Sequence, residues 1–215
     1  MVLFGIERGA PSHSVSGPAA ERPYVRWHTA LASFFLVRHA ESPWSPDEMR
    51  PLSNSGRAAS EKLVKPLSAL RLSAIYSSPY RRAIETIEPL AASLGLPVHE
   101  VNDLRERALG SISGIPFGEA VAATFSDFDH SFPGGESSRD AQQRALRAID
   151  RIREAHPDDR IVIATHGNLM ALYLNVLDRD IGFDFWRSLA LPDVFQISSS
   201  TSRTLVFERI VGSAT

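Results

Sequence analysis

The chain has 215 residues, of which 43% are hydrophobic and 22% are charged, a composition typical of one soluble globular domain with a substantial core. Its net charge of −2 gives no support for binding to nucleic acid or to a membrane surface. The sequence contains no cysteine, which excludes a thiolate nucleophile, a cysteine-ligated zinc and any disulfide bond. No apolar stretch approaches the ~20 residues of a membrane span, and the apolar start of the chain is too short for a secretory signal, so we expect a cytoplasmic protein.

Residues 1–32 differ in composition from the rest of the chain. Glycine, proline and serine recur there and interrupt every periodic pattern. Segments of this kind bury too little apolar surface to fold, and chain ends tolerate their removal. We therefore expect a loosely ordered N-terminal extension over 1–32 and a single domain over 33–215.

From residue 33 onward, short apolar runs alternate with longer stretches in which apolar residues recur at helical spacing. The short runs predict strands over 33–38, 73–77, 98–102, 160–165, 194–199 and 204–210. The longer stretches predict helices over 53–70, 79–94, 117–130, 136–156 and 167–178. Strands separated by helices form right-handed crossovers, so we expect a three-layer α/β/α fold with a mostly parallel central sheet. A short polar stretch joins the last two strands, which predicts one antiparallel strand.

Arg38 and His39 follow the first predicted strand. In an open α/β sheet, ligands bind at the carboxyl ends of the strands. There the Arg38 guanidinium can hold a phosphate or a carboxylate through two parallel hydrogen bonds. The His39 imidazole can act as a base, a metal ligand or a nucleophile, and the dipeptide alone leaves these roles open.

Three further strand ends carry residues of related chemistry. Arg81 and Arg82 lie in the first turn of a predicted helix, where anions are favoured, although two solvated surface arginines fit equally well. His166 and Gly167 follow the fourth strand; a lone histidine there is more often structural, but Gly167 lets the backbone come close to a ligand. Glu106, after the third strand, fits either a surface ion pair or a proton donor.

Together, these strand ends supply what phosphoryl transfer requires. The reaction needs cationic groups around the phosphoryl oxygens, a nucleophile in line with the leaving group, and an acid to protonate that group. Two histidines, at least two arginines and one glutamate meet these needs, so we expect no metal and no cofactor. No glycine-rich phosphate loop or dinucleotide-binding motif suggests a different reaction.

Five motifs, in order and in spacing, resemble those of the histidine phosphatase superfamily, which includes the cofactor-dependent phosphoglycerate mutases. The motifs lie at 36–42, 77–86, 104–106, 133–137 and 165–167, and residues 51–57 resemble the family's leucine-to-glycine helix entry. The resemblance covers the chain from the first predicted strand to the last and implies a phosphoglycerate mutase-like fold.

The resemblance implies that His39 attacks phosphorus and forms a phosphohistidine. Arg38, Arg82 and His166 would hold the phosphoryl oxygens, and Glu106 would protonate the leaving alcohol and then activate water. Neighbouring guanidinium charges would lower the pKa of His39 toward the neutral, nucleophilic form. The strand ends and the resemblance together assign catalysis to His39, Glu106 and His166, and phosphate binding to Arg38, Arg82 and Gly167.

The chain departs from the family pattern at two positions. The pattern places its arginine directly before Ala-x-Gln-Thr, which selects Arg82 rather than Arg81, but Glu85 stands where the glutamine is usual. Ser45 stands where an asparagine commonly follows the histidine by six residues, which puts one phosphate contact in doubt.

The segment 115–134 bears on the choice between hydrolysis and a mutase reaction. It is expected to cover the pocket and contains no lysine or arginine. It carries instead acidic and aromatic residues, namely Glu119, Asp127, Asp129, Phe117, Phe125, Phe128 and Phe132. Such a lid is poorly suited to a second phosphate or a carboxylate, so it favours hydrolysis and a leaving group that is apolar, aromatic or weakly anionic. Alternatively, these phenylalanines belong to the core of the 117–130 helix.

We therefore expect a metal-independent phosphomonoester hydrolase that acts on a small phosphorylated substrate, with no nucleic-acid or membrane partner. A cofactor-dependent phosphoglycerate mutase is the main alternative, because 166–168 and Arg107 look mutase-like. A regulatory protein phosphohistidine phosphatase is a further alternative, although a lidded cleft favours small molecules. The sequence is compatible with an oligomer and does not identify the substrate.

Overall fold

A six-stranded sheet forms the centre of the protein, whose computed structural model describes residues 33–199 and 205–211. The N-terminal extension predicted over 1–32 lies outside the described residues. The strands are β1 (Phe34–Arg38), β2 (Ala74–Ser77), β3 (Val98–Glu100), β4 (Ile161–Thr165), β5 (Asp193–Ser199) and β6 (Leu205–Val211). Their order across the sheet is β3-β2-β4-β1-β5-β6.

The strand directions confirm the mostly parallel sheet. β1 pairs in parallel with β4, β4 with β2, and β2 with β3, whereas β5 runs antiparallel to both β1 and β6. The parallel strands are joined by helical crossovers, as their geometry requires. β5 is thus the one antiparallel strand that the short connection near the C-terminus predicted.

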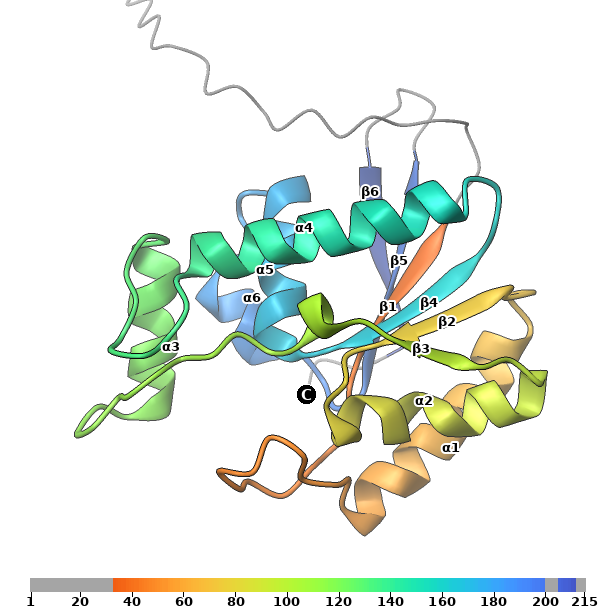
Figure 1. Cartoon of the computed structure of the whole chain (residues 1–215), viewed down its shortest axis with the longest axis horizontal. Helices are drawn as coiled ribbons and strands as arrows, with labels where there is room; N and C mark the ends of the chain where they lie inside the picture. The colour runs from red at the N-terminus through yellow and green to blue at the C-terminus, as the bar shows by residue number, and fades with distance from the viewer. Residues whose placement is uncertain (1–32, 200–204, 212–215) are drawn as a thin grey trace, which may run out of the picture.

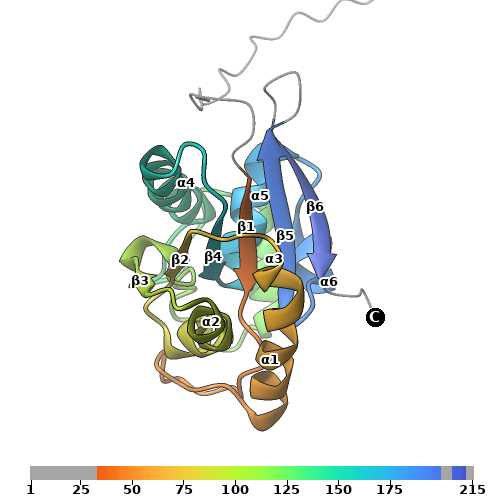
Figure 2. The same cartoon turned by 90° about the vertical axis from the view of Figure 1, so that its right-hand side faces the viewer.

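Helices cover both faces of the sheet, which confirms the three-layer architecture (Figures 1 and 2). They are α1 (Asn54–Ser68), α2 (Arg81–Leu94), α3 (Phe117–Ser126), α4 (Ser138–Ala155), α5 (Gly167–Leu177), α6 (Phe183–Ser188) and the short 3-10 helix η1 (Asn102–Leu104). In Figure 1, α1 and α2 lie together on one side of the sheet and α4 on the other.

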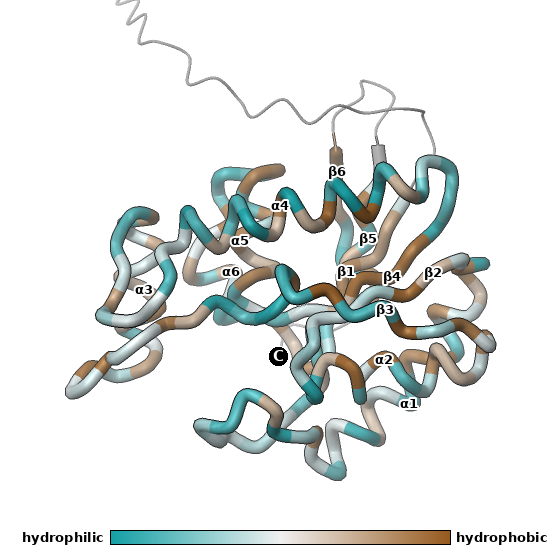
Figure 3. The backbone as a smooth tube through the Cα atoms, viewed as in Figure 1, coloured by the Kyte–Doolittle hydropathy of each residue, from teal (hydrophilic) through white to brown (hydrophobic). Residues whose placement is uncertain are grey.

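Successive residues of β1 belong to two different hydrophobic cores, one on each face of the sheet. Phe35 and Val37 pack with the residues of α1 and α2, whereas Phe34 and Leu36 pack with those of α4 and α5. This alternation follows from the two-residue period of a strand, and it explains why a strand buried on both faces reads as a continuous apolar run. Figure 3 shows hydrophobic residues along the strands, whereas α4 alternates between hydrophilic and hydrophobic residues because only one of its faces is buried.

Two predicted boundaries were wrong, and one helix was not predicted. The strand expected over 98–102 ends at Glu100, and the chain then turns into η1. The helix expected over 117–130 ends at Ser126, because the Asp127 side chain accepts the Asp129 N–H and turns the chain away. Helix α6 was not expected, since its six residues are too few to show a helical period.

No helix in the described part of the chain is long and apolar enough to cross a membrane. The cytoplasmic location expected from the sequence stays a prediction.

Gly56 and Gly118 provide a matched test of packing at helix starts. A Cβ atom at Gly56 would lie 2.1 Å from the carbonyl oxygen of Glu41, whereas a Cβ at Gly118 in α3 meets nothing within 4 Å. Gly56→Ala should therefore lower the free energy of unfolding by about 1–3 kcal/mol. Gly118→Ala should leave it unchanged or raise it by up to about 1 kcal/mol. Urea unfolding of both variants measures the difference, and equal effects would contradict the contact at Glu41.

Candidate active site

The register of three parallel strands places the candidate residues at one edge of the sheet. Arg38 lies opposite Thr165, and Ser77 lies opposite Ala164. Two hydrogen bonds extend these pairings past the ends of the strands, from the His39 N–H to the Thr165 oxygen at 3.0 Å and from the Ser78 N–H to the Ala164 oxygen at 2.9 Å. His39, Ser78 and His166 are therefore the first residues beyond three aligned strand ends.

The hydrogen bond made by His39 fixes which ring nitrogen is free. Nδ1 lies 2.7 Å from the carbonyl oxygen of Ala40. Because that oxygen can only accept, Nδ1 carries the proton and Nε2 keeps its lone pair. The Arg82 Nε donates to this Nε2 at 3.3 Å. Burial is the main reason that the pKa of His39 falls to about 3; the Ala40 contact opposes the fall, and the charges of Arg82, Arg38 and Arg50 add to it.

His166 lies beside His39 and is completely buried. The two imidazole centroids are 5.2 Å apart, and the Tyr80 ring packs 5.1 Å from His166 on another side. His166 Nε2 lies 2.7 Å from the Ser78 hydroxyl, whereas Nδ1 has no hydrogen-bond partner among the described residues. Burial, and then the charges around it, hold the pKa of His166 well below its ordinary value, so this ring is also neutral.

The structure separates the two adjacent arginines of α2. Arg82 is 3% exposed, faces His39, and donates from Nη1 to the carbonyl oxygen of Glu48 at 2.8 Å. Burial lowers the pKa of Arg82 to about 10, which leaves it protonated at neutral pH. Arg81 is exposed and forms an ion pair with Glu85. Only Arg82 therefore reaches the candidate site.

Arg38 is held by backbone carbonyls on one side and by a glycine on the other. Its Nη1 donates to the Leu189 oxygen at 2.7 Å and to the Ala190 oxygen at 3.3 Å. A Cβ atom at Gly167 would lie 2.8 Å from Arg38 Nε and 2.9 Å from Cζ. Gly167 thus makes room for the guanidinium, a different use from the direct approach to a ligand that its position suggested.

The carboxyl group of Glu106 lies at the N-terminus of α5, the helix that begins at Gly167. Its Oε1 accepts the Leu169 and Arg107 N–H groups at 2.9 Å each, and its Oε2 accepts the Asn168 N–H at 3.1 Å. These three N–H groups fix the direction of the Glu106 carboxyl group. The six residues predicted from the sequence are therefore brought together at one sheet edge.

Arg50 is a member of this cluster that the sequence analysis missed. It belongs to loop 41–52, which connects β1 to α1, and its charge lowers the pKa values of His39, His166 and Arg82. Its Nη1 donates to the carbonyl oxygen of Ser45 at 3.1 Å. Ser45, the residue at the family's asparagine position, thus contacts Arg50 through its backbone.

The aromatic residues of segment 115–134 divide between core and surface. Phe125 and Phe128 contact each other and pack against buried residues, as the alternative interpretation of this segment held. Phe117 is 58% exposed and contacts Trp186 of α6. In Figure 1, α3 lies on the side of the molecule toward which β1 and β4 point.

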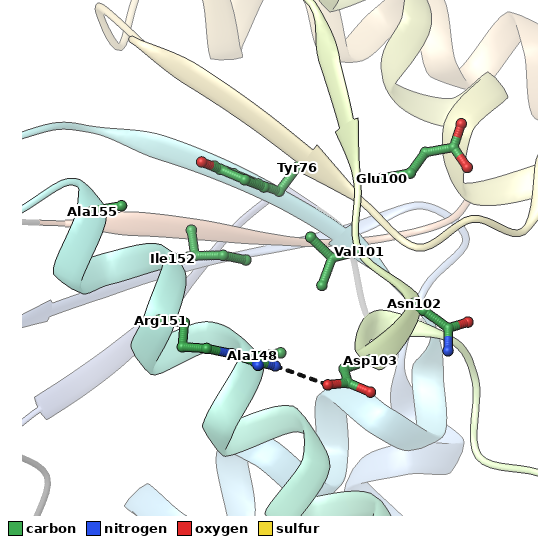
Figure 4. A pocket seen from close by; sticks show the side chains of 9 residues that line it. All are labelled: Tyr76, Glu100, Val101, Asn102, Asp103, Ala148, Arg151, Ile152 and Ala155. Carbon is green, nitrogen blue, oxygen red and sulfur yellow. Dashed lines mark hydrogen bonds and ion pairs between the residues drawn. The ribbon is translucent and has the colours of Figure 1, made fainter.

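Two other features bear on ligands. Within 33–199 and 205–211, no group of three or more His, Cys, Asp or Glu side chains is arranged to hold a metal ion. A separate hollow of about 450 Å³ lies between Tyr76, η1 and α4, and an Arg151–Asp103 ion pair crosses it (Figure 4). None of the six candidate residues lines this hollow, so it is distinct from the candidate active site.

The two neutral histidines predict a specific loss of stability in mild acid. In the unfolded chain a histidine binds a proton near pH 6.5, whereas folded His39 resists protonation down to about pH 3. The unfolded state therefore gains protons first, and stability falls as the pH drops below 6.5, by at most about 1.4 kcal/mol per pH unit for each such histidine. Urea unfolding between pH 7.5 and 5 measures this slope, and His39→Gln should make it shallower. Equal slopes for the two proteins would contradict the burial of a neutral His39.

Comparisons with known proteins identify the family and the fold. A family model of the histidine phosphatase superfamily (branch 1) matches residues 34–203. The chain is 33% identical over 156 residues to phosphoglycerate mutase-like protein 4 of Arabidopsis thaliana. The aligned region covers 65% of this chain and 68% of that protein. It is 31% identical over 173 residues to the metal-independent phosphoserine phosphatase of Arabidopsis thaliana, and this aligned region covers 71% of each protein. The solved structure of mycobacterial glucosyl-3-phosphoglycerate phosphatase shares the fold, with a TM-score of 0.68, 23% identity, and coverage of 85% of this chain and 99% of that one. The chain belongs to the histidine phosphatase superfamily.

Proposed function

We propose that the protein is a metal-independent phosphomonoester hydrolase that works through a phosphohistidine on His39. The observation that carries the proposal is the state of the His39 ring. Its Nδ1 proton is bound to Ala40, its unprotonated Nε2 faces the Arg82 guanidinium, and its pKa of about 3 keeps it neutral at working pH. An imidazole of this kind, with guanidinium groups around it, is suited to attack a phosphate dianion.

The proposed reaction has two steps. First, His39 Nε2 bonds to phosphorus as the ester P–O bond breaks, and Glu106 gives its proton to the departing alkoxide. Second, the Glu106 carboxylate takes a proton from water, the water oxygen bonds to phosphorus, and the P–N bond breaks to release inorganic phosphate. Arg38, Arg82 and His166 hold the phosphoryl oxygens in both steps, which is the electrostatic part of the catalysis.

The contacts of Arg107 support hydrolysis over a mutase reaction. A mutase binds a second anionic group, and Arg107 beside Glu106 was the residue that suggested this in the sequence. Arg107 is 5% exposed and donates from Nη1 to the Ser138 hydroxyl at 3.1 Å, so its guanidinium contacts the start of α4. Segment 115–134 supplies no replacement cation. The named relatives include phosphatases, which agrees with this choice.

The surface around the site supports a substrate with an apolar or aromatic leaving group. Three large hydrophobic side chains that the described residues leave exposed lie on segments next to the strand ends. They are Trp44 and Met49 in loop 41–52, which follows β1, and Leu191 next to the Ala190 carbonyl that Arg38 contacts. Apolar surface of this kind commonly marks a binding area.

Substrate profiling tests the proposal directly. Phosphate release should be observed from several phosphomonoesters without added metal and in the presence of EDTA, with phenyl phosphate turned over faster than 3-phosphoglycerate. His39→Ala should abolish turnover and the acid-labile phosphoenzyme. Interconversion of phosphoglycerates that requires 2,3-bisphosphoglycerate and releases no phosphate would establish a mutase instead, and turnover confined to phosphohistidine peptides would establish a regulatory phosphatase.

The adjacent arginines of α2 provide a matched pair for the phosphate contact. Arg82→Gln removes a buried donor next to His39, so kcat/KM should fall by about 100-fold or more. Arg81→Gln removes an exposed charge of the same type from the neighbouring position and should cost only a few-fold. Steady-state kinetics on phenyl phosphate separates the two, and similar losses in both variants would place the wrong arginine in the site.

A further inference from the structure

We propose that Glu85 is a positioning residue that fixes loop 41–52 and thereby holds Arg50 over the phosphate site, where Arg50 binds a phosphoryl oxygen. The inference rests on the proposed function for the identity of the ligand, a phosphate group. In Figures 1 and 2 this loop follows β1 and lies beside the start of α2, the helix that carries Glu85.

Loop 41–52 is closed at its base by backbone contacts. The Ser53 N–H donates to the Glu41 oxygen at 3.1 Å, and the Ser42 hydroxyl donates to the Pro51 oxygen at 2.7 Å. These hydrogen bonds tie the two ends of the loop together, and contacts with α2 fix its direction. Loops with such closed ends commonly carry functional residues.

Inside the loop, Arg50 keeps donors free for a ligand. Its Nη1 donates to the carbonyl oxygens of Ser45 at 3.1 Å and of Asp47 at 3.4 Å. Among the described residues, its Nε is buried and has no hydrogen-bond partner. The Asp47 carbonyl that Arg50 contacts is next to that of Glu48, which accepts from Arg82, and Arg82 in turn donates to His39, so a chain of hydrogen bonds places Arg50 near the nucleophile. An arginine held by carbonyls beside two neutral histidines is suited to an anion.

The carboxylate of Glu85 is the contact that fixes the loop to α2. Its Oε2 accepts the Leu52 N–H at 2.8 Å and the Arg57 Nη1 at 3.0 Å, and its Oε1 accepts the Arg81 Nε at 2.6 Å. Leu52 is only two residues beyond Arg50. Burial raises the pKa of Glu85, but the Leu52 amide and the two guanidinium groups outweigh it and keep the net pKa below its ordinary value. The carboxylate is thus ionised when it holds the loop.

A second contact links the same loop to the catalytic cluster. Arg82, one helical turn before Glu85, donates to the carbonyl oxygen of Glu48 at 2.8 Å. Helix α2 therefore holds the loop at two points, one inside the active site and one outside it. Because Glu85 is outside, its removal can change Arg50 without removing a group that touches the substrate.

A double-mutant cycle tests the proposal, with inorganic phosphate as the probe in calorimetry and phenyl phosphate as the substrate. Arg50→Gln should weaken phosphate binding by about 10- to 100-fold, the range expected for a lost charged hydrogen bond. Glu85→Gln keeps an acceptor for Leu52 but loses both ion pairs, and should weaken binding by about 3- to 10-fold. The double variant should bind like Arg50→Gln alone, because Glu85 acts through Arg50. Glu88→Gln, an exposed carboxylate on the same helix, is the control and should match the wild type.

Three results would overturn the proposal. Wild-type phosphate affinity in Arg50→Gln removes Arg50 from the site. A Glu85→Gln variant that behaves like Glu88→Gln removes the positioning role, and so does a Glu85→Gln loss that persists undiminished in the Arg50→Gln background. Should Glu85→Gln fail to fold, Arg57→Gln removes one ion pair from the same Oε2 at an exposed position and should weaken binding in the same direction; no change there also overturns the proposal.

The two proposals fail in different ways. If the wild type binds phosphate but hydrolyses no ester, the proposed function is wrong, and the affinity cycle still tests Glu85 and Arg50. If the wild type hydrolyses phenyl phosphate and both variants match it in KM and in phosphate affinity, only the present inference is wrong. A wild type that binds no phosphate overturns both.

Discussion

The site depends on a concentration of positive charge that the protein orients without a direct ion pair to Arg38, Arg50 or Arg82 among the described residues. Each of its arginines is held mainly by backbone carbonyls: Arg38 by Leu189 and Ala190, Arg82 by Glu48, and Arg50 by Ser45 and Asp47. Carbonyl dipoles fix a guanidinium in place but leave its full charge. A carboxylate in the same position would cancel that charge and compete with the ligand. The positive charge of these guanidinium groups is therefore available to a bound phosphate dianion.

Arginines elsewhere in the protein show the contrasting arrangement. Arg144 of α4 is 4% exposed and forms two hydrogen bonds with the carboxylate of Glu136, and it also donates to the carbonyl oxygens of Asp103 and Arg105. This neutralised pair fixes the segment that leads to Glu106. The protein therefore uses arginine–carboxylate pairs where it needs a rigid support and arginine–carbonyl contacts where it needs available charge.

Much of the fold and most of the site could be predicted from the sequence, because both follow from local patterns. A buried strand is a short apolar run, so the expected strand over 160–165 differs by one residue from the observed Ile161–Thr165. Since parallel strands end at one edge, the residues after those runs were expected to meet, and the register of β1, β2 and β4 places them together. Helix α6 could not be found this way, because six residues show no period.

Arg50 shows the limit of local reasoning. Nothing in its immediate sequence distinguishes it from a solvated loop arginine. Its position depends on a hydrogen bond between Leu52 and Glu85, residues 33 positions apart, and on the contact of Arg82 with the same loop. The distinction between Arg81 and Arg82 is of the same kind, since only the direction of α2 decides which side chain is buried. Such choices are made by tertiary contacts, which periodicity does not describe.

The hydrogen bond from His39 Nδ1 to Ala40 has a consequence for the energy of the proposed intermediate. Once Nε2 carries the phosphoryl group, the proton on Nδ1 stays in place and the ring becomes a phosphorylated imidazolium. Positive charge on the ring weakens the P–N bond, so the intermediate is a high-energy phosphoryl donor. In the proposed mechanism, the contact that selects the attacking tautomer therefore also makes the phosphoenzyme short-lived, because the phosphoryl group passes readily to water.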